Sequence, residues 1–348
     1  MKFLPLENVR ILDLSLLLPG PLCTMMLAEM GAEVIKVERP GTGDLMKTMS
    51  PVSYEYMNGN KRIIRVDLKS EEGIHLIKET AKTSNVFVEG FRPGVVKRLG
   101  IDFENIKKEN PSIIYCSISG YGQTSPNAEL PGHDINYQSI TGYFSICGDP
   151  DGGAEFPSGI QTADIAGTMF ALSSILAALH KPKDSSAVFL DISIANAMAM
   201  WMMPRYLEFL TLGKPAKNEL MGRGAYGIFK TRDEKYICLG VVEHHFWVNL
   251  CNKLDFKDFL ENEELVGWPA VNANRKFIVP RLEKVFLEKD LDYWLKELKE
   301  ADVPVSEVRD IENWVEDPQF KYNNFIPHKS DGSIDENHFR RFPIDFKF

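Results

Sequence analysis

The fold is decided by a stretch near the start of the chain, where residues 9–38 read VRILDLSLLLPGPLCTMMLAEMGAEVIKVE. Its first segment, Val9–Leu14, is mostly apolar and predicts a buried strand. The segment Pro21–Met30 predicts a helix, and Gly31 follows it in a position typical of a residue that ends a helix. Glu33–Glu38 predicts a second strand. A strand, a helix and a strand of these lengths indicate a crossover unit with parallel strands.

The same alternation of strand and helix signals continues through the first half of the chain. Further strands are predicted at Ile63–Leu68, Asn85–Glu89, Ser112–Ser119 and Ala187–Ile194. Between the first two of these, Ser70 followed by acidic residues has the pattern of a helix N-cap. Strands separated by helices indicate a parallel sheet with helices on both faces. We therefore expect an α/β fold with a Rossmann-like large domain.

The second half of the chain has a different pattern, and 348 residues are more than one compact core usually holds. A long, methionine-rich helix is broken by glycine and proline near residues 213–215. Two short strands, Tyr226–Lys230 and Tyr236–Val242, then lead into helical stretches rich in lysine and glutamate. We expect a large domain over residues 1–195, a linker helix over 196–221 and a small α+β domain over 222–324.

The composition argues against several classes of protein. The chain has a net charge of −9 and no basic block, which argues against a nucleic-acid surface or an anionic membrane surface. The five cysteines are scattered without a C-x-x-C pair, which indicates a reducing compartment. We find no apolar run long enough to span a bilayer and no secretory signal over Met1–Arg10. We expect a cytoplasmic protein without a nucleic-acid or membrane partner.

Common cofactor and metal motifs are missing from the sequence. There is no G-x-x-x-x-G-K-[ST] phosphate loop, no G-x-G-x-x-G after the first strand and no H-E-x-x-H. His244 and His245 are adjacent, and neighbours on a helix point to different sides, so the pair is a poor metal chelator. We expect neither a bound metal nor a separate cofactor.

Three polar clusters could carry chemistry. His133 lies in Gly132–Tyr137, beyond the strand Ser112–Ser119, and ligands of open α/β sheets bind beyond the carboxyl ends of strands. Asp164 lies at the start of an apolar helix, and Glu243 lies between a strand and a helix. Each cluster could instead cap or border a helix, so the residues alone leave both roles open. One imidazole and two carboxyls are the groups that proton transfer from two sides requires.

Segments along nearly the whole chain resemble the family III CoA transferases. They are Leu6–Leu14, Pro19–Cys23, Met30–Pro40, Asn60–Arg62, Val66–Lys69, Glu89–Gly94 with Arg98, Gly132–Tyr137 and Ala163–Asp164. The G-H-D-I-N-Y motif is similar to that of the α-methylacyl-CoA racemase branch of this family. The transferase branch has a glutamine where this chain has Leu18, and it has a glycine run that Met221–Tyr226 lacks.

The resemblance implies that His133 and Asp164 act as two bases on an acyl-CoA, with Glu243 orienting His133. Removal of the proton beside the thioester gives a planar enolate, and a proton returned to the opposite face inverts the carbon. Backbone N–H groups at the Asp164 helix start would hold the enolate oxygen. An apolar surround would raise the pKa of Asp164. The function expected first is racemisation of 2-methylacyl-CoA thioesters. The alternative is a CoA transferase in which Asp164 forms a mixed anhydride with the acyl group.

The resemblance also implies a CoA site, with CoA as part of the substrate. Arg39 and Arg98 would meet phosphates, because guanidinium groups match phosphate geometry. The adenine and ribose would lie against Val66, Asp67, Leu68 and Lys69. The other expected CoA contacts are Gly90, Phe91, Arg92, Gly132, Asp134 and Tyr137.

Members of the family form interlocked homodimers, so the resemblance implies the same assembly here. Residues 325–348 would then complete the large domain. The site would lie between the large domain of one subunit and the small domain of the other. Glu243 would in that case serve His133 of the partner subunit.

Overall fold

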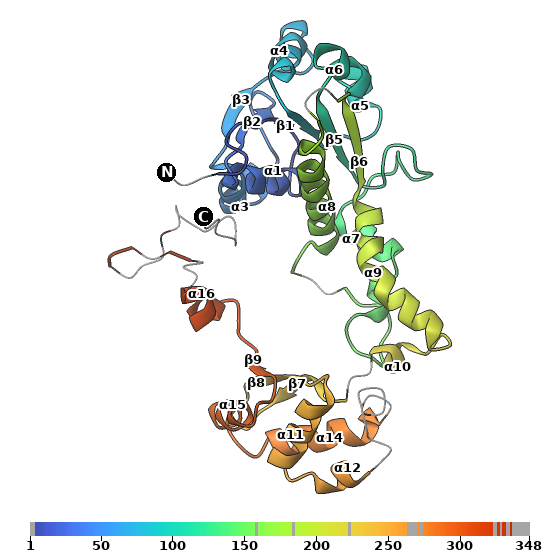
Figure 1. Cartoon of the computed structure of the whole chain (residues 1–348), viewed down its shortest axis with the longest axis vertical. Coiled ribbons are helices and arrows are strands. Elements are labelled where there is room, and N and C mark those ends of the chain that lie inside the picture. The colour runs from blue at the N-terminus through green and yellow to red at the C-terminus, as the bar shows by residue number, and fades with distance from the viewer. Residues whose placement is uncertain are drawn as a thin grey trace. The chain divides into compact units, whose positions relative to one another are not determined.

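The computed structural model describes residues 4–156, 159–182, 185–221, 224–262, 271, 274–322, 326–327, 329–331 and 335. The chain divides into two units (Figure 1), and each is described by itself. The larger unit comprises Met1–Phe144, Phe156–Glu208 and Asn324–Phe348, and the smaller comprises Ser145–Glu155 and Phe209–Asn323.

This division differs from the predicted boundaries in two places. The first part of the expected linker helix, up to Glu208, groups with the larger unit, and Ser145–Glu155 groups with the smaller one. The predicted completion of the large domain by residues 325–348 falls mostly outside the described residues.

A six-stranded parallel sheet forms the centre of the larger unit. Its strands are β1 (Arg10–Leu14), β2 (Glu33–Glu38), β3 (Arg62–Arg65), β4 (Val86–Glu89), β5 (Ile114–Ser119) and β6 (Val188–Ser193). The order across the sheet is β3-β2-β1-β4-β5-β6, and every neighbouring pair is parallel. This is the strand order of a Rossmann fold, so the predicted α/β class is confirmed. The order reverses between β1 and β4, which places the topological switch point there.

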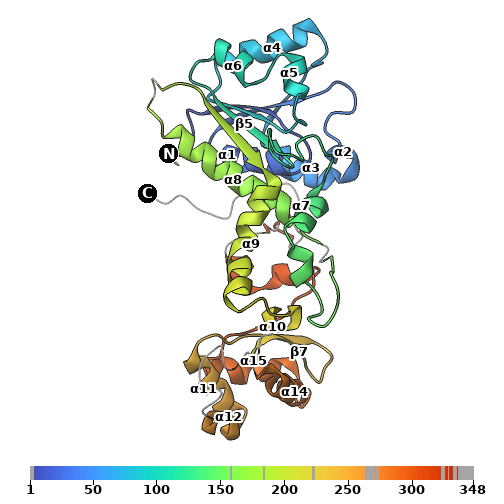
Figure 2. The ribbon, with the colours of Figure 1, turned by 90° about the vertical axis from the view of Figure 1, so that its right-hand side faces the viewer.

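Helices cover both faces of this sheet, as Figure 2 shows. On one face α1 (Pro19–Glu29) and α8 (Thr162–Leu179) pack over a core that includes Ile11, Val88 and Cys116. On the other face α4 (Glu71–Lys82), α5 (Val95–Leu99) and α6 (Phe103–Glu109) cover Phe87 and Tyr115.

A local sequence signal explains the start of α4. The predicted cap at Ser70 is confirmed, because its Oγ accepts the Gly73 N–H at 2.9 Å at the start of α4.

The remaining helices that involve the larger unit are α2 (Met46–Met49), α3 (Pro51–Asn58), α7 (Asp134–Ile140), a 3-10 turn (Tyr143–Ile146) and α9 (Ile194–Thr211).

Helix α8 departs from the expectation that no segment could span a membrane. It is long and apolar enough for a membrane span by length and composition. Seven of its residues, including Ala163, Ala171 and Ile175, are nevertheless buried in the larger unit. The absence of a membrane partner stays a prediction.

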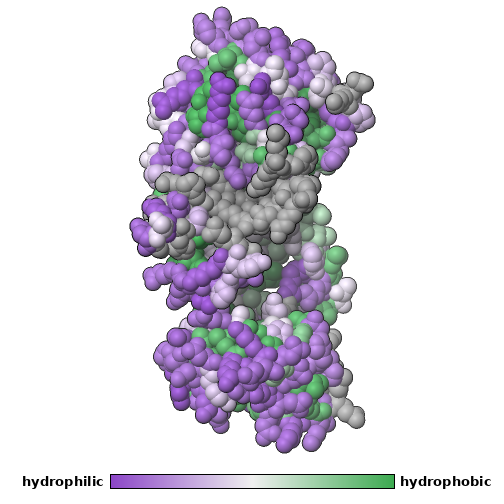
Figure 3. All heavy atoms as spheres, turned by 60° about the vertical axis from the view of Figure 1, so that its left-hand side comes forward, coloured by the Kyte–Doolittle hydropathy of each residue, from purple (hydrophilic) through white to green (hydrophobic). Residues whose placement is uncertain are grey.

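The smaller unit is an α+β structure, as predicted. Its antiparallel sheet has the order β7-β8-β9, formed by β7 (Tyr226–Lys230), β8 (Tyr236–Gly240) and β9 (Val305–Glu307). The helices are α10 (Lys217–Met221), α11 (His244–Lys253), α12 (Lys257–Glu261), α14 (Arg275–Phe286), α15 (Leu291–Glu300) and α16 (Pro318–Tyr322), with a 3-10 turn at Trp314–Glu316. A separate apolar core includes Ile237, Trp247 and Phe286. On the face drawn in Figure 3, hydrophilic residues cover most of each unit between smaller apolar patches.

Candidate active site

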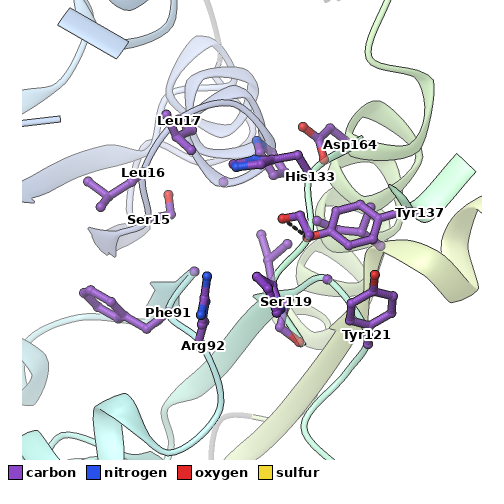
Figure 4. A pocket seen from close by; sticks show the side chains of 18 of the residues that line it. Ser15, Leu16, Leu17, Phe91, Arg92, Ser119, Tyr121, His133, Tyr137 and Asp164 are labelled. Atoms are coloured by element: carbon purple, nitrogen blue, oxygen red, sulfur yellow. Dashed lines mark hydrogen bonds between the residues drawn. The ribbon is translucent and has the colours of Figure 1, made fainter. Parts of the chain in front are cut away.

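A pocket of about 270 Å³ lies at the carboxyl edge of the parallel sheet (Figure 4). The segments after β1, β4 and β5 contribute Ser15–Leu17, Gly90–Pro93 and Gly120–Tyr121 to its lining. Since β1 and β4 flank the switch point, the pocket lies where open α/β sheets bind ligands.

The pocket contains seven of the residues that the sequence indicated for the site. They are Gly90, Phe91, Arg92, Gly132, His133, Tyr137 and Asp164. Arg92 faces the cavity across from His133 and Asp164 in Figure 4. The lining therefore combines an imidazole, a carboxyl and a guanidinium group.

His133 reaches the pocket from the residue before α7. Its backbone N–H donates to Asn136 Oδ1 at 3.0 Å, which fixes the start of the helix. The hydroxyl of Tyr137 donates to the carbonyl oxygen of Gly132 at 2.6 Å, which ties the preceding residue to the same helix. His133 itself is exposed and lines the cavity.

Asp164 reaches the pocket from the first turn of α8. The helix begins at Thr162 after an N-cap at Gln161, so the suggestion that Asp164 caps the helix is wrong. The Asp164 carboxyl accepts no hydrogen bond among those found between described residues. Burial first, and the Asp134 charge second, raise the pKa of Asp164 to about 7. The predicted rise is confirmed.

Asp134 plays a different part from the CoA contact that we expected. It is 9% exposed and is absent from the described pocket lining. Its Oδ1 accepts the N–H groups of Ala163 at 2.8 Å and Asp164 at 3.1 Å, and its Oδ2 accepts from Gln138. The helix N–H groups expected to hold an enolate oxygen are therefore occupied. A carboxylate is favourable at this position because a helix N-terminus carries partial positive charge.

Buried ion pairs support the loop after β1, and sequence reasoning missed them. Lys36 Nζ lies 3.1 Å from Asp44 and donates to the Ser15 carbonyl oxygen at 2.8 Å. Asp44 in turn accepts the N–H of Leu17 at 3.1 Å. Leu17 has a φ of 64°, a left-handed conformation that is uncommon for a leucine. The sequence signal that could have indicated this buried ion pair is Lys36, a lysine among the apolar residues of strand β2.

A second buried pair lies beside the first. Lys61 Nζ is 3.3 Å from Asp13 and donates to Thr24 Oγ1 at 2.8 Å. Asp13 also accepts the N–H of Ser15 at 2.9 Å. Burial lowers the pKa of Lys61 to about 8, although Asp13 opposes the shift.

The other predicted residues lie outside the pocket. Arg39 follows β2 and Val66 follows β3, so both lie along the carboxyl edge of the same parallel sheet as the pocket. Arg39 is exposed, and Val66 is buried at the start of the segment that includes Asp67, Leu68 and Lys69. Arg98 is exposed on α5.

Glu243 belongs to the smaller unit, where it is the exposed N-cap residue of α11. Its role toward His133 stays a prediction. Within the described part of the chain, no group of three or more His, Cys, Asp or Glu residues could hold a metal ion.

Comparisons with known proteins agree on the family and on the fold. The model of the family described as CoA-transferase family III matches residues 6–348. Succinyl-CoA:glutarate CoA-transferase of Homo sapiens is 34% identical over 333 residues, which cover 92% of this chain and 76% of the relative. Alpha-methylacyl-CoA racemase of Homo sapiens is 30% identical over 327 residues, which cover 89% and 79%. A crystal structure of a CAIB/BAIF family protein from Brucella suis matches with a TM-score of 0.81 at 27% identity, covering 97% of this chain and 95% of that one.

Proposed function

Because the chain belongs to CoA-transferase family III, we propose that it moves CoA from an acyl-CoA to a free carboxylic acid with Asp164 as the nucleophile. One observation carries the proposal: the Asp164 carboxyl lines the pocket and is desolvated enough to raise its pKa to about 7. Desolvation, and the absence of a hydrogen-bond donor to this carboxyl among the described residues, leave the ionised carboxylate reactive. About half of the Asp164 carboxyls carry that charge near neutral pH.

The reaction proceeds by exchange of acyl groups on Asp164. Its carboxylate attacks the thioester carbonyl, the C–S bond breaks, and a mixed anhydride and CoA thiolate form. The thiolate then attacks the Asp164 carbonyl, which releases the donor acid and leaves CoA as a thioester on Asp164. The same steps in reverse order, with the acceptor acid, give the new acyl-CoA and restore the carboxylate.

The charge of the lining suits carboxylic acids. Among the described lining residues, Arg92 and His133 have basic side chains. A guanidinium group binds a carboxylate through two parallel hydrogen bonds. The relative named succinyl-CoA:glutarate CoA-transferase makes succinyl-CoA and glutarate the first pair to assay.

Racemisation of a 2-methylacyl-CoA is the second candidate, favoured by His133 and Asp164 lining one pocket. Racemisation is the function expected first from the sequence. We propose the transferase first because the relative named as a CoA-transferase is 34% identical to this chain, whereas the relative named as a racemase is 30% identical.

The test is to incubate the protein with succinyl-CoA and glutarate and to measure glutaryl-CoA. We expect Asp164→Asn to lower the rate by about 10³-fold or more, because the nucleophile is lost. His133→Gln is expected to change it by less than about tenfold, because no step of the transfer needs the imidazole as a base. Glu104→Gln on α6 makes the same chemical change at an exposed carboxyl and is the matched control.

A parallel experiment separates the two candidates. A 2-methylacyl-CoA is incubated in D₂O without an acceptor acid, and deuterium at the 2-position is measured. The transferase leaves this position unlabelled. Deuterium uptake that depends on His133, together with no transfer to a panel of mono- and dicarboxylic acids, would replace the transferase with the racemase.

We also propose that the protein works as an interlocked homodimer. Helix α9 supports this, because its large apolar side chains Met200, Trp201, Met203 and Leu210 are all at least 40% exposed. An exposed apolar surface of this kind is typical of an interface. In the dimer, Glu243 would orient the partner's His133. A cytoplasmic location and the contacts of Arg39, Arg98 and residues 66–69 with CoA are part of the same proposal.

A further inference from the structure

Glu89 is a buried carboxylic acid that the proposed reaction does not use. It is the last residue of β4, directly before Gly90, Phe91 and Arg92 of the pocket lining, and it is 1% exposed. Its Oε2 accepts the N–H of Phe91 at 2.8 Å. Its Oε1 is buried and has no hydrogen-bond partner among the described residues. A buried oxygen without a partner is unfavourable and requires a reason.

Glu89 begins a row of polar side chains across three strands. The strand register pairs Glu89 with Ser117 of β5, and Ser117 with Asp191 of β6, so the three point to the same face of the sheet. Gln123 binds to this row, since its Nε2 donates to Ser117 Oγ at 2.8 Å and its backbone N–H donates to Asp191 Oδ2 at 3.0 Å.

The polar row supports two pocket segments at once. Phe91 and Arg92 lie two and three residues after Glu89, and Tyr121 lies two residues before Gln123. Figure 4 shows Phe91, Arg92 and Tyr121 along one side of the cavity. A change at Glu89 therefore reaches that side of the pocket through the backbone.

The surroundings of Glu89 favour its neutral form. Burial raises the pKa of Glu89 to about 7, the Ser117 hydroxyl and the Phe91 N–H oppose the rise, and the Asp191 charge adds to it. The groups around the carboxyl are Leu14 on β1, Ser117 and Tyr115 on β5, Asp191 on β6, and Asp102 beyond Tyr115. No basic side chain among the described residues offsets the charge.

We propose that Glu89 is a positioning residue that must be neutral for this pocket to bind CoA tightly. A neutral carboxyl accepts the Phe91 N–H and can donate its own proton to Ser117, whereas a carboxylate can only accept. Ionisation leaves a buried charge that no basic side chain among the described residues offsets, which favours opening of the turn to water. Arg92 moves with that turn. The inference rests on the proposed function, because the ligand is the CoA part of the substrate.

The experiment measures the Kd of CoA by calorimetry at several pH values. For the wild type we expect Kd to rise by up to about tenfold from about pH 6 to about pH 8, because the neutral fraction of Glu89 falls by that factor. Glu89→Gln keeps an acceptor and a donor in the same shape without a charge, so its Kd should stay nearly constant. The phosphates of CoA titrate alike with every variant.

Two further variants identify the titrating group. Asp164→Asn removes the pocket-lining carboxyl, whose pKa is also raised, and should keep the wild-type rise in Kd. Ser117→Ala removes a hydroxyl that lowers the pKa of Glu89, so the rise in Kd should move to higher pH. If Glu89→Gln does not fold, Ser117→Ala alone decides.

The outcomes separate the two proposals. A wild-type rise in Kd that persists in Glu89→Gln, or that disappears in Asp164→Asn instead, overturns the role of Glu89 and leaves the transferase intact. A wild-type protein that binds no CoA at any pH overturns the proposed function and this inference with it.

Discussion

The carboxyl groups of Asp134 and Asp164 both lie at the start of helix α8, and their surroundings differ. Asp134 accepts the N–H groups of Ala163 and Asp164 at the start of α8, a position at which a carboxylate is favourable. Asp164 lies beside this carboxylate, the described part of the chain supplies no such donors to it, and its pKa rises to about 7. Two carboxyl groups at the start of α8 thus take different roles. Asp134 supports the helix, and Asp164 is the reactive group.

The pair leads to a prediction about pH. Asp134→Asn keeps the acceptor oxygen but removes the negative charge, so the pKa of Asp164 should fall by up to about one unit. Asp164 must be ionised to attack, so the wild-type kcat rises as pH increases through about 7. In the variant this rise should occur at lower pH. The pH profile of kcat measures the shift, with Glu104→Gln as control. A midpoint that stays or moves upward would contradict this account.

His133 and Asp164 could be selected from sequence because motifs surround them and because they follow predicted strand and helix signals. Asp134 could not be assigned correctly. Its role depends on a contact with Ala163, 29 residues further along the chain, which no local pattern contains. Glu89 was predicted as a strand end and as the first residue of the family segment Glu89–Gly94, but no role was assigned to it, since its buried environment is set by strands β1, β5 and β6.

At the scale of elements, the loop after β1 depends on charges buried behind it. Lys36 and Asp44 have side chains that are 0% exposed, and together they hold Ser15 and Leu17. Removing one member of a buried pair leaves the other charge uncompensated, which typically costs about 3–5 kcal/mol. The loop conformation, including the left-handed Leu17, therefore relies on both members.

A double-mutant cycle tests this dependence. We expect Lys36→Met to lower the free energy of unfolding by about 3–5 kcal/mol, because Asp44 remains charged and buried. Lys36→Met with Asp44→Asn should be less destabilised than the sum of the two single variants. Urea unfolding provides the free energies. Strictly additive effects would show that the two side chains do not act as a pair.

Strand positions were predictable where apolar runs are long and bounded. Glu33–Glu38 and Tyr226–Lys230 were predicted at their observed ends. Val305–Glu307 was missed because three residues are too short to show a period. Its strand state is fixed by pairing with β8, which is distant in sequence.

The division of the whole molecule was harder to predict than its elements. Ser145–Glu155 groups with the smaller unit although the residues on both sides of it belong to the larger one. The reason is tertiary contact with α10: Lys217 Nζ donates to the Gly153 carbonyl oxygen, and Asn218 donates to Asp151. Contacts between residues more than sixty positions apart cannot be predicted from local composition.

Assembly is tested at this same scale. We expect the wild type to sediment with twice the mass of one chain, and Met200→Glu with Trp201→Glu to shift it toward the monomer, because charges on an apolar interface are unfavourable. Analytical ultracentrifugation at several concentrations measures the change, and Lys97→Glu on the exposed side of α5 is the control. A wild type that stays monomeric at high concentration would contradict the dimer.

The pocket at the switch point has a consequence for synthesis. Its walls come from segments between Ser15 and Ile194, so a chain emerging from the ribosome cannot form the complete cavity until more than half of its residues have been made. Ligand added during translation would therefore protect from proteolysis only nascent chains that extend beyond Ile194. The length of the shortest protected chain would show how much of the sequence must be made before the pocket can bind its ligand.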